Sequence, residues 1–335
     1  MKTLFIFKAV LVLNICIFGQ WVKQTAETTA SFRGLSVVNQ KIVWASGTAG
    51  TVLRTINGGK DWKVLNVSGA EKLDFRDIEA FDEKTAYVLS IGEGEQSRIY
   101  KTTDGGQSWK QQFVNKDPKA FFDAIACWSS LNCIAVSDPV DGHFKLIQTL
   151  DGENWEQIKS NNLPASRDGE AAFAASGTCL IAALSGRAYL VTGGSAARVF
   201  ISYDFGKNWT ARETPVASGS PGMGIFSIAM LDSKNGIIVG GDYQKAEAAD
   251  SNAALTTDGG KSWYPVKGLS GYRSGVVYID RKRIIAVGSN GSDISTDGGK
   301  TWQRLGSEPL NAVNAKGPKA IWAVGPKGGI YRLKL

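Results

Sequence analysis

The sequence predicts an all-β fold, a β-propeller in which seven four-stranded blades form a closed ring. Three observations support this prediction. A polar turn that ends in tryptophan recurs along the chain, the recurring tryptophans lie one blade length apart, and the two chain ends carry complementary parts of one blade. The 335 residues include 39 glycines and ten tryptophans, a composition typical of many short strands joined by tight turns.

The recurring turn follows the pattern Ser/Thr-x-Asp-Gly-Gly-x-Ser/Thr-Trp and is most complete at residues 295–302. Its Asp side chain can accept hydrogen bonds from backbone N–H groups two or three residues on, and its glycines permit the positive φ of a tight hairpin. The tryptophan that follows can bury roughly 150 to 250 Å² and so anchors the next strand. We assign these turn residues structural roles. They are Asn57, Asp104, Asp151, Asp204, Asp258 and Asp297, followed in turn by Trp62, Trp109, Trp155, Trp209, Trp263 and Trp302.

The six turn tryptophans are spaced 47, 46, 54, 54 and 39 residues apart, which is the length of a propeller blade. Each interval repeats the same order of predicted elements: three strands, the polar turn and a strand that begins with tryptophan. No linker or low-complexity segment separates the intervals, so residues 20–335 are predicted to form one domain. The expected blades span residues 32–66, 75–114, 122–158, 170–212, 225–266 and 272–305.

The seventh blade is expected to combine both ends of the chain. Trp21 begins a strand that resembles those after the turns, and it lies 41 residues before Trp62, but its own turn is missing. At the other end, residues 310–314, 320–325 and 329–333 form three strand patterns, and the chain stops where a turn is due. Pairing the strand at Trp21 with these three would close the ring and remove its free sheet edges.

Residues 1–19 are predicted to be a secretory signal peptide. Lys2 and Lys8 precede an apolar run at residues 9–18, which is about half the length of a membrane span, and cleavage is expected between Gly19 and Gln20. Bulky Ile15 before Cys16 argues against a lipoprotein site. The mature chain is therefore expected to be periplasmic or secreted, with no transmembrane segment. Its formal charge falls from +7 to +5 and is spread along the sequence, which argues against nucleic-acid binding.

The cysteines fit an oxidising compartment. Cys127 and Cys133 frame a short segment between two apolar strand patterns, so we predict a disulfide across that hairpin. Cys179 lies in an apolar run and is expected to be a buried free thiol.

A binding site is expected on the face of the ring opposite the tryptophan turns, where the longer loops gather. These loops are predicted at residues 91–97, 137–144, 186–197 and 240–252. The same face receives the starts of the innermost strands. Alignment of these starts places Arg33, Arg76, Asp123 and Arg273 at one structural position around the channel mouth, with Asn311 in the last blade. The arginines could bind a carboxylate, phosphate or acidic peptide, or could pair with Asp77 and Asp123 as a structural network.

Other polar residues are predicted on that face without a pattern that assigns them a reaction. One run contains the only histidine of the chain, but its Pro and Gly indicate a rigid turn with solvated acids, and we expect neither a metal nor a cofactor. That run contributes Asp138, Asp141 and His143. The remaining polar residues predicted on this face have a spacing that does not require an acid/base pair; they are Glu170, Arg198, Asp242, Tyr243 and Tyr272.

The turn copies, with the motifs at residues 31–36, 75–78, 137–142 and 323–328, resemble bacterial Asp-box (BNR) repeat proteins called photosystem II stability/assembly factor-like. The resemblance covers nearly all blades and implies an exported, sialidase-like seven-bladed propeller; photosynthetic members of the family help to assemble a membrane complex through protein contacts. It favours a non-enzymatic, monomeric scaffold that binds a protein partner in the cell envelope or an acidic ligand. No dinucleotide fingerprint supports the oxidoreductase label that some such proteins carry.

The alternative is a glycoside hydrolase that acts on glycans from the same face. The sialidase motif Phe/Tyr-Arg-Ile-Pro is kept only as Phe32-Arg33, followed by Gly34 and Leu35. Arg33, Arg76 and Arg273 could imitate the sialidase arginine triad, with Tyr272 or Tyr243 near. A shared fold is weak support for shared catalysis, and no catalytic residue is assigned.

Overall fold

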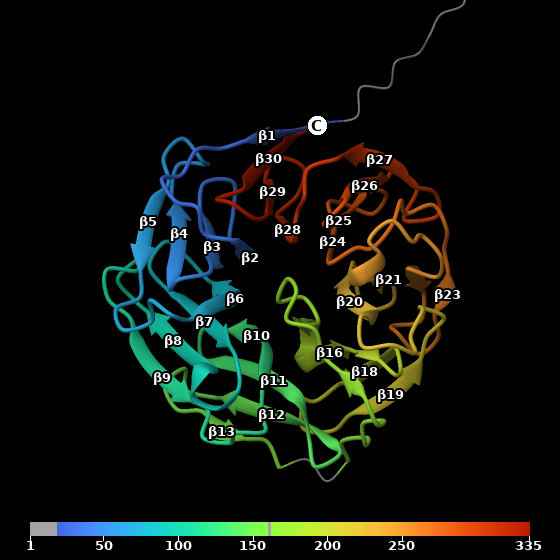
Figure 1. The fold of residues 1–335 in the computed structure, drawn as a ribbon, viewed down its shortest axis with the longest axis horizontal. Helices are drawn as coiled ribbons and strands as arrows, with labels where there is room; N and C mark the ends of the chain where they lie inside the picture. The colour runs from blue at the N-terminus through green and yellow to red at the C-terminus, as the bar shows by residue number, and fades with distance from the viewer. Residues whose placement is uncertain (1–18, 160–161) are drawn as a thin grey trace, which may run out of the picture.

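The computed structural model describes residues 19–159 and 162–335 and is a ring of seven antiparallel sheets around a central channel (Figure 1). The all-β prediction and the count of seven blades are confirmed. The predicted signal peptide lies, except for Gly19, outside the described residues. In each blade the strands run outward from the channel, and hydrophobic side chains pack between neighbouring blades.

The first three blades match their predicted bounds closely. Blade 1 contains β2 (Phe32–Val37), β3 (Val43–Gly47), β4 (Thr51–Thr55) and β5 (Lys63–Asn66). Blade 2 contains β6 (Asp74–Ala80), β7 (Ala86–Ile91), the short 3₁₀ helix η1 (Gly94–Gln96), β8 (Arg98–Thr102) and β9 (Lys110–Val114). Blade 3 contains β10 (Phe122–Ser129), β11 (Asn132–Val140), β12 (His143–Thr149) and β13 (Glu156–Gln157).

Blades 4 to 6 follow the same order. Blade 4 contains β15 (Leu180–Ala183), η2 (Leu184–Gly186), β16 (Arg187–Val191), β18 (Arg198–Ser202) and β19 (Thr210–Glu213). Blade 5 contains β20 (Met223–Met230), β21 (Gly236–Asp242), η3 (Tyr243–Lys245), β22 (Ala253–Thr256) and β23 (Tyr264–Pro265). Blade 6 contains β24 (Gly275–Tyr278), β25 (Ile284–Gly288), β26 (Gly291–Ser295) and β27 (Gln303–Gly306).

The seventh blade joins the two ends of the chain, as predicted. Its sheet order is β1 (Gln20–Lys23), β30 (Ile330–Lys334), β29 (Ile321–Val324) and β28 (Ala312–Ala315). Trp21 lies opposite Leu333 in the antiparallel register, and Figure 1 shows β1 against β30 beside the C-terminus. The Trp21 indole is buried and donates a hydrogen bond to Ser292 Oγ at 2.9 Å, which also ties this blade to blade 6.

The Asp-box turns are stabilised by their own side chains. In the last copy Ser295 Oγ donates to Asp297 Oδ1 and accepts the Gly299 N–H, while Asp297 Oδ1 accepts the N–H groups of Lys300 and Thr301. In this complete copy the Asp side chain therefore accepts the N–H groups three and four residues after it, one residue farther along the chain than predicted. In the shorter copy Asp151 accepts the N–H groups two and three residues after it.

The turn tryptophans are not equally buried. Trp209, Trp263 and Trp302 are buried, and each donates its indole N–H to the carbonyl of the glycine three residues before it. Trp62, Trp109 and Trp155 are half-buried. Each of these three packs edge-on against an aromatic ring of the preceding blade, so every copy still anchors its strand to a neighbour.

Blade 4 differs from the prediction. Residues 170–171 form the short strand β14 (Glu170–Ala171), which pairs with β17 (Gly193–Gly194) and extends the sheet of blade 5 instead of starting blade 4. The innermost strand is β15, and residues 187–191 of the predicted loop 186–197 form its neighbour β16. The predicted loop at 137–144 is likewise mostly strand, reduced to a tight turn at Asp141 and Gly142, both with positive φ. Regular pairing therefore extends farther than the repeat comparison indicated.

The cysteine predictions are confirmed. Cys127 and Cys133 lie directly opposite each other in the β10–β11 hairpin and form a disulfide, and Cys179 is a buried free thiol.

Closure of the ring can be tested at Trp21. We expect Trp21→Ala to lower the free energy of unfolding by about 3 to 5 kcal/mol, because it removes a buried indole from the seam between the two chain ends. Lys23→Ala, at an exposed position of the same strand, should change it by less than about 0.5 kcal/mol. Urea unfolding followed by tryptophan fluorescence measures both, and equal stability of the two variants would contradict a closing role for β1.

Candidate functional site

The central channel is occupied by residues 172–178, which we call the central segment. It lies between β14 and β15, and its small side chains suit the narrow space where the innermost strands converge. Gly177 has a φ of 76°, and a Cβ there would lie 2.1 Å from Asp77 Oδ1, so only glycine fits. The central segment thus closes the channel and turns its mouth into a pocket.

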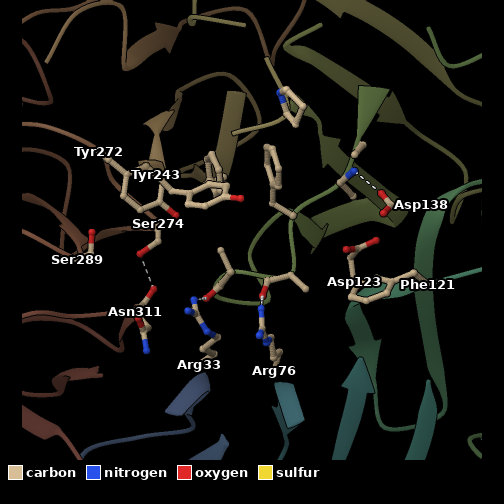
Figure 2. Close-up of a pocket in the computed structure, with 17 residues that line it drawn as sticks. Arg33, Arg76, Phe121, Asp123, Asp138, Tyr243, Tyr272, Ser274, Ser289 and Asn311 are labelled. Atoms are coloured by element: carbon tan, nitrogen blue, oxygen red, sulfur yellow. Dashed lines mark hydrogen bonds between the residues drawn. The ribbon is translucent and has the colours of Figure 1, made fainter. Parts of the chain in front are cut away.

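Five other blades hold the central segment through hydrogen bonds. Arg33 Nη1 donates to Ala175 O at 3.1 Å and Arg76 Nη1 to Ala174 O at 3.2 Å, as Figure 2 shows. The remaining bonds run from the Ala172 N–H to Asp138 Oδ1 (2.8 Å), from Ser176 Oγ to Ser274 O (2.7 Å) and from the Ile228 N–H to Thr178 O (3.1 Å).

Four pocket side chains stand at β-bulges near the starts of innermost strands. The strand registers skip one residue at Arg33 in β2, Arg76 in β6, Asp123 in β10 and Phe226 in β20. A bulge leaves one residue unpaired and re-aims its side chain, here into the channel mouth. Arg33, Arg76 and Asp123 therefore occupy equivalent positions in their strands.

The pocket has a volume of about 500 Å³ and lies on the face opposite the Asp-box turns. One wall is aromatic: Phe173 of the central segment stacks on Phe226 with 3.9 Å between ring centroids, and Tyr272 and Tyr243 meet Phe226 edge-on. Asn311 also lines the pocket, as expected for the last blade. A cavity of this size with an apolar wall and a few polar groups has the character of a ligand site.

The basic side of the pocket is formed by Arg33 and Arg76, which lie next to each other in Figure 2. Arg76 Nε donates to Asp74 Oδ2 at 2.8 Å. Arg33 forms no salt bridge within the described part of the chain, and burial together with the neighbouring Arg76 lowers the pKa of its guanidinium. Arg33 is therefore a partly buried cation without a paired anion.

The acidic side of the pocket is formed by Asp123 of β10 and Asp138 of β11, which face each other in Figure 2. Asp123 is 1 % exposed, and its Oδ2 has no hydrogen-bond partner. Burial raises the pKa of Asp138 to about 6. Burial and the nearby Asp138 carboxylate raise the pKa of Asp123 well above its ordinary value.

Arg273 does not join the other two arginines, so that prediction is wrong. Its side chain is fully buried inside blade 6, where Nε donates to Asp293 Oδ2 at 2.8 Å and Nη1 donates to Asn290 Oδ1 at 2.6 Å. Burial lowers the pKa of this guanidinium, and the Asp293 carboxylate counteracts the shift. These three arginines therefore do not imitate a sialidase triad.

Glu170 and Arg198 form a second buried ion pair, outside the pocket. Arg198 Nε donates to Glu170 Oε1 at 2.9 Å, and Thr192 Oγ1 and the Arg167 N–H complete the carboxylate's bonds. This pair fastens β14 to blade 4 and leaves neither group free for acid/base chemistry. Asp242 is also buried and accepts the N–H of Gln244.

Asp141 and His143 are exposed at the β11–β12 turn and do not line the pocket. Asp138, Tyr243 and Tyr272 are the remaining predicted residues that do. In the described residues, no group of three or more His, Cys, Asp or Glu is placed to hold a metal ion. Over the same part of the chain, no helix is long and apolar enough to cross a membrane.

Sequence reasoning placed Tyr243 and Tyr272 on this face but missed Phe173 and Phe226 of the aromatic wall, and it missed the central segment. Phe173 lies in the stretch unique to blade 4, and Phe226 follows Ile225, where blades 1, 2, 3 and 6 have Phe or Tyr. The pairing of Arg273 had a usable signal. The residue two places before the box Ser or Thr is apolar or aromatic in the other five copies, but in blade 6 it is Asp293.

The fold and its turns define the class of the protein, a seven-bladed Asp-box propeller. A family model for the BNR/Asp-box repeat matches residues 293–304, the turn of blade 6. The chain carries that repeat, and the predicted resemblance is confirmed by a structural match to YCF48.

The structural matches cover whole propellers. The structure of YCF48 bound to a D1 peptide matches with a TM-score of 0.71 and 16% identity over 95% of this chain and 96% of that chain. YCF48 from Cyanidioschyzon merolae matches with a TM-score of 0.68 and 16% identity over 93% of this chain and 98% of that chain. The WD40 propeller domain of Doa1 matches with a TM-score of 0.64 and 10% identity over 95% of this chain and 97% of that chain. At these identities the likeness concerns the fold. The comparison with curated proteins gives no significant match.

The structural role of Arg273 can be separated from the pocket role of Arg33. We expect Arg273→Ala to lower the free energy of unfolding by about 3 to 5 kcal/mol, because it leaves the Asp293 carboxylate buried and unpaired. Arg33→Ala should cost about 1 kcal/mol or less, because the loss of one hydrogen bond at the pocket edge is partly offset by relief of the repulsion from Arg76.

Chemical denaturation measures these losses. The double variant Arg273→Met/Asp293→Leu should recover much of the stability, because it removes both buried charges together. A double variant no more stable than Arg273→Ala would contradict the assignment of the loss to an uncompensated charge.

Proposed function

We propose that the protein is a non-enzymatic scaffold that binds an acidic group of a protein partner in the pocket at the channel mouth. The observation that carries this proposal is Arg33, a partly buried guanidinium without a carboxylate partner, placed beside a second arginine. Holding two cations together lowers stability unless an anion compensates them. A carboxylate suits this role because it can accept two charge-assisted hydrogen bonds.

The arginines have donors left after they hold the central segment. Each uses Nη1 for a backbone carbonyl, and Arg76 also uses Nε for Asp74. The aromatic wall opposite offers contact area for an apolar side chain next to the acidic group. YCF48, which shares the fold, has been solved with a bound D1 peptide, and this supports a peptide as the kind of ligand.

We also propose that the protein acts outside the cytoplasm, in the periplasm or as a secreted protein. Residues 1–19 have the charge and apolar pattern of an export signal. The Cys127–Cys133 disulfide supports this location, because such bonds persist in oxidising compartments.

The arginine pocket can be tested with a defined peptide. We expect the acetylated tripeptide Ala-Ala-norleucine with a free carboxylate to bind, and the double variant Arg33→Ala/Arg76→Ala to bind it about tenfold or more weakly, through loss of charge-assisted bonds. The same peptide with an amidated C-terminus should bind weakly to both proteins. Isothermal titration calorimetry at constant salt measures the affinities.

The matched control is Arg281→Ala/Lys282→Ala, which removes two exposed positive charges from the β24–β25 turn on the Asp-box face. It should bind the carboxylate peptide as the unaltered protein does. Equal loss in both double variants would reduce the effect to net charge and contradict a specific pocket. Unchanged recovery of an envelope partner by Arg33→Ala/Arg76→Ala would contradict this face as the partner site.

Export can be tested by fractionation of cells that express the full chain. We expect the protein in the periplasm or medium, with Gln20 as its first residue and the Cys127–Cys133 bond formed, as shown by mass spectrometry without reduction. Accumulation of the chain in the cytoplasm with residues 1–19 intact would rule out the proposed location. Replacing the apolar run with polar residues is the control, and it should abolish export.

A further inference from the structure

The acid pair Asp123–Asp138 is not explained by the scaffold or by the arginine pocket. Asp138 has a structural task, since Oδ1 accepts the Ala172 N–H of the central segment. Asp123 is nearly fully buried and keeps an unpartnered Oδ2 in the lining of the pocket. A buried polar atom without a partner is uncommon in native proteins and needs a cause.

No neighbouring cation neutralises Asp123. Arg76 is close enough to oppose the rise in the pKa of Asp123, but no salt bridge joins the two groups in the described part of the chain, and Arg76 Nε is engaged by Asp74. The Asp138 carboxylate lies near Asp123, and so does the thiol of Cys179, which is uncharged when protonated. The site therefore carries excess acid at one end and excess base at the other.

We infer that the pocket binds a dipolar ligand whose ammonium or guanidinium group lies against Asp123 and Asp138 while its carboxylate lies against Arg33 and Arg76. This inference rests on the proposed function for the carboxylate end and adds a second, cation-binding subsite. A primary ammonium has three donors, which can satisfy the unpartnered Asp123 Oδ2 and the second oxygen of Asp138 together. The aromatic wall lies beside both ends and suits the aliphatic part of such a ligand.

The proximity of the two carboxylates gives the subsite a pH dependence with a definite sign. Burial raises the pKa of both carboxyl groups, and the nearby Asp138 carboxylate raises that of Asp123 further, so the pair holds a proton in mildly acidic solution. A bound ammonium takes the place of that proton, which passes to the solvent. Affinity for the cation is therefore weak at about pH 5 and rises toward about pH 8, where a lysine ammonium remains charged.

The test compares three peptides that differ only in their positive charge. The first is acetylated Ala-Ala-Lys, the second is acetylated Ala-Ala-norleucine without a cation, and the third is Ala-Ala-norleucine with a free amino terminus; all keep the free carboxylate. We expect the lysine peptide to bind about tenfold or more tightly than its norleucine analogue at about pH 8, with the advantage lost near pH 5. A gain from the third peptide instead would identify a terminal amine as the source of the cation.

Two isosteric variants connect the gain to the acids. Asp123→Asn and Asp138→Asn should each abolish the advantage of the cationic peptide over acetylated Ala-Ala-norleucine. In Asp123→Asn, which changes an oxygen without a hydrogen-bond partner, binding of acetylated Ala-Ala-norleucine should be nearly unchanged. Thermal unfolding verifies that each variant is folded. Should one fail to fold, the other variant and the pH profile of the unaltered protein still decide the question.

The outcomes separate this inference from the function on which it rests. Binding of the norleucine peptide that needs Arg33 and Arg76, with no gain from either cation at any pH, would overturn the cation subsite and leave the arginine pocket intact. A gain that survives in Asp123→Asn and Asp138→Asn would overturn it as well. A lysine-peptide affinity that is unchanged in Arg33→Ala/Arg76→Ala would support the acid subsite while removing the arginines from the proposal. Absence of binding by all three peptides would overturn both.

Discussion

The antiparallel pairing of β1 with β30 is the contact on which the rest of the propeller depends. It joins the two chain ends within one sheet, so the ring has no open seam between its first and last blades. Closure fixes how far the innermost strands stand from the channel axis. That distance leaves room for one extra strip of chain, and the central segment occupies it with alanine, serine, glycine and threonine beside a single phenylalanine.

The central segment determines what the channel mouth can do. An open channel would expose the ends of the innermost strands to water on both faces of the ring. Because the central segment occupies the channel, it forms the floor of a pocket at the channel mouth. The floor is held partly by the same charged groups that line the pocket, since Arg33 and Arg76 each donate one hydrogen bond to its backbone and Asp138 accepts one from it. Support and recognition are thus shared within single side chains, which limits how far those side chains can move when a ligand binds.

Much of the fold could be predicted because each repeated turn is stabilised by residues within its own motif and can therefore be recognised from the sequence alone. The Ser/Thr, Asp and Gly of each box satisfy one another locally, as the bonds around Asp297 show, so the pattern survives whatever surrounds it. The place of Trp21 followed from counting turns. Blade 4 was partly mispredicted because residues 170–178 left the repeat, and nothing local in Glu170 indicates pairing with Arg198 or β17.

The site was harder to predict, because it depends on contacts between blades that no single repeat contains. Arg33 and Arg76 reach the pocket because a bulge in each innermost strand turns the side chain inward. Arg273 has the same place in its motif, but β24 begins only at Gly275, two residues after Arg273. In addition, Asp293 supplies a buried carboxylate where the other Asp-box copies have apolar or aromatic side chains. One departure from the repeat thus buries Arg273, and another, the central segment, shapes the pocket. In this propeller the repeats specify the ring and the bulges that carry Arg33 and Arg76, while departures from the repeat decide which of the aligned arginines line the pocket.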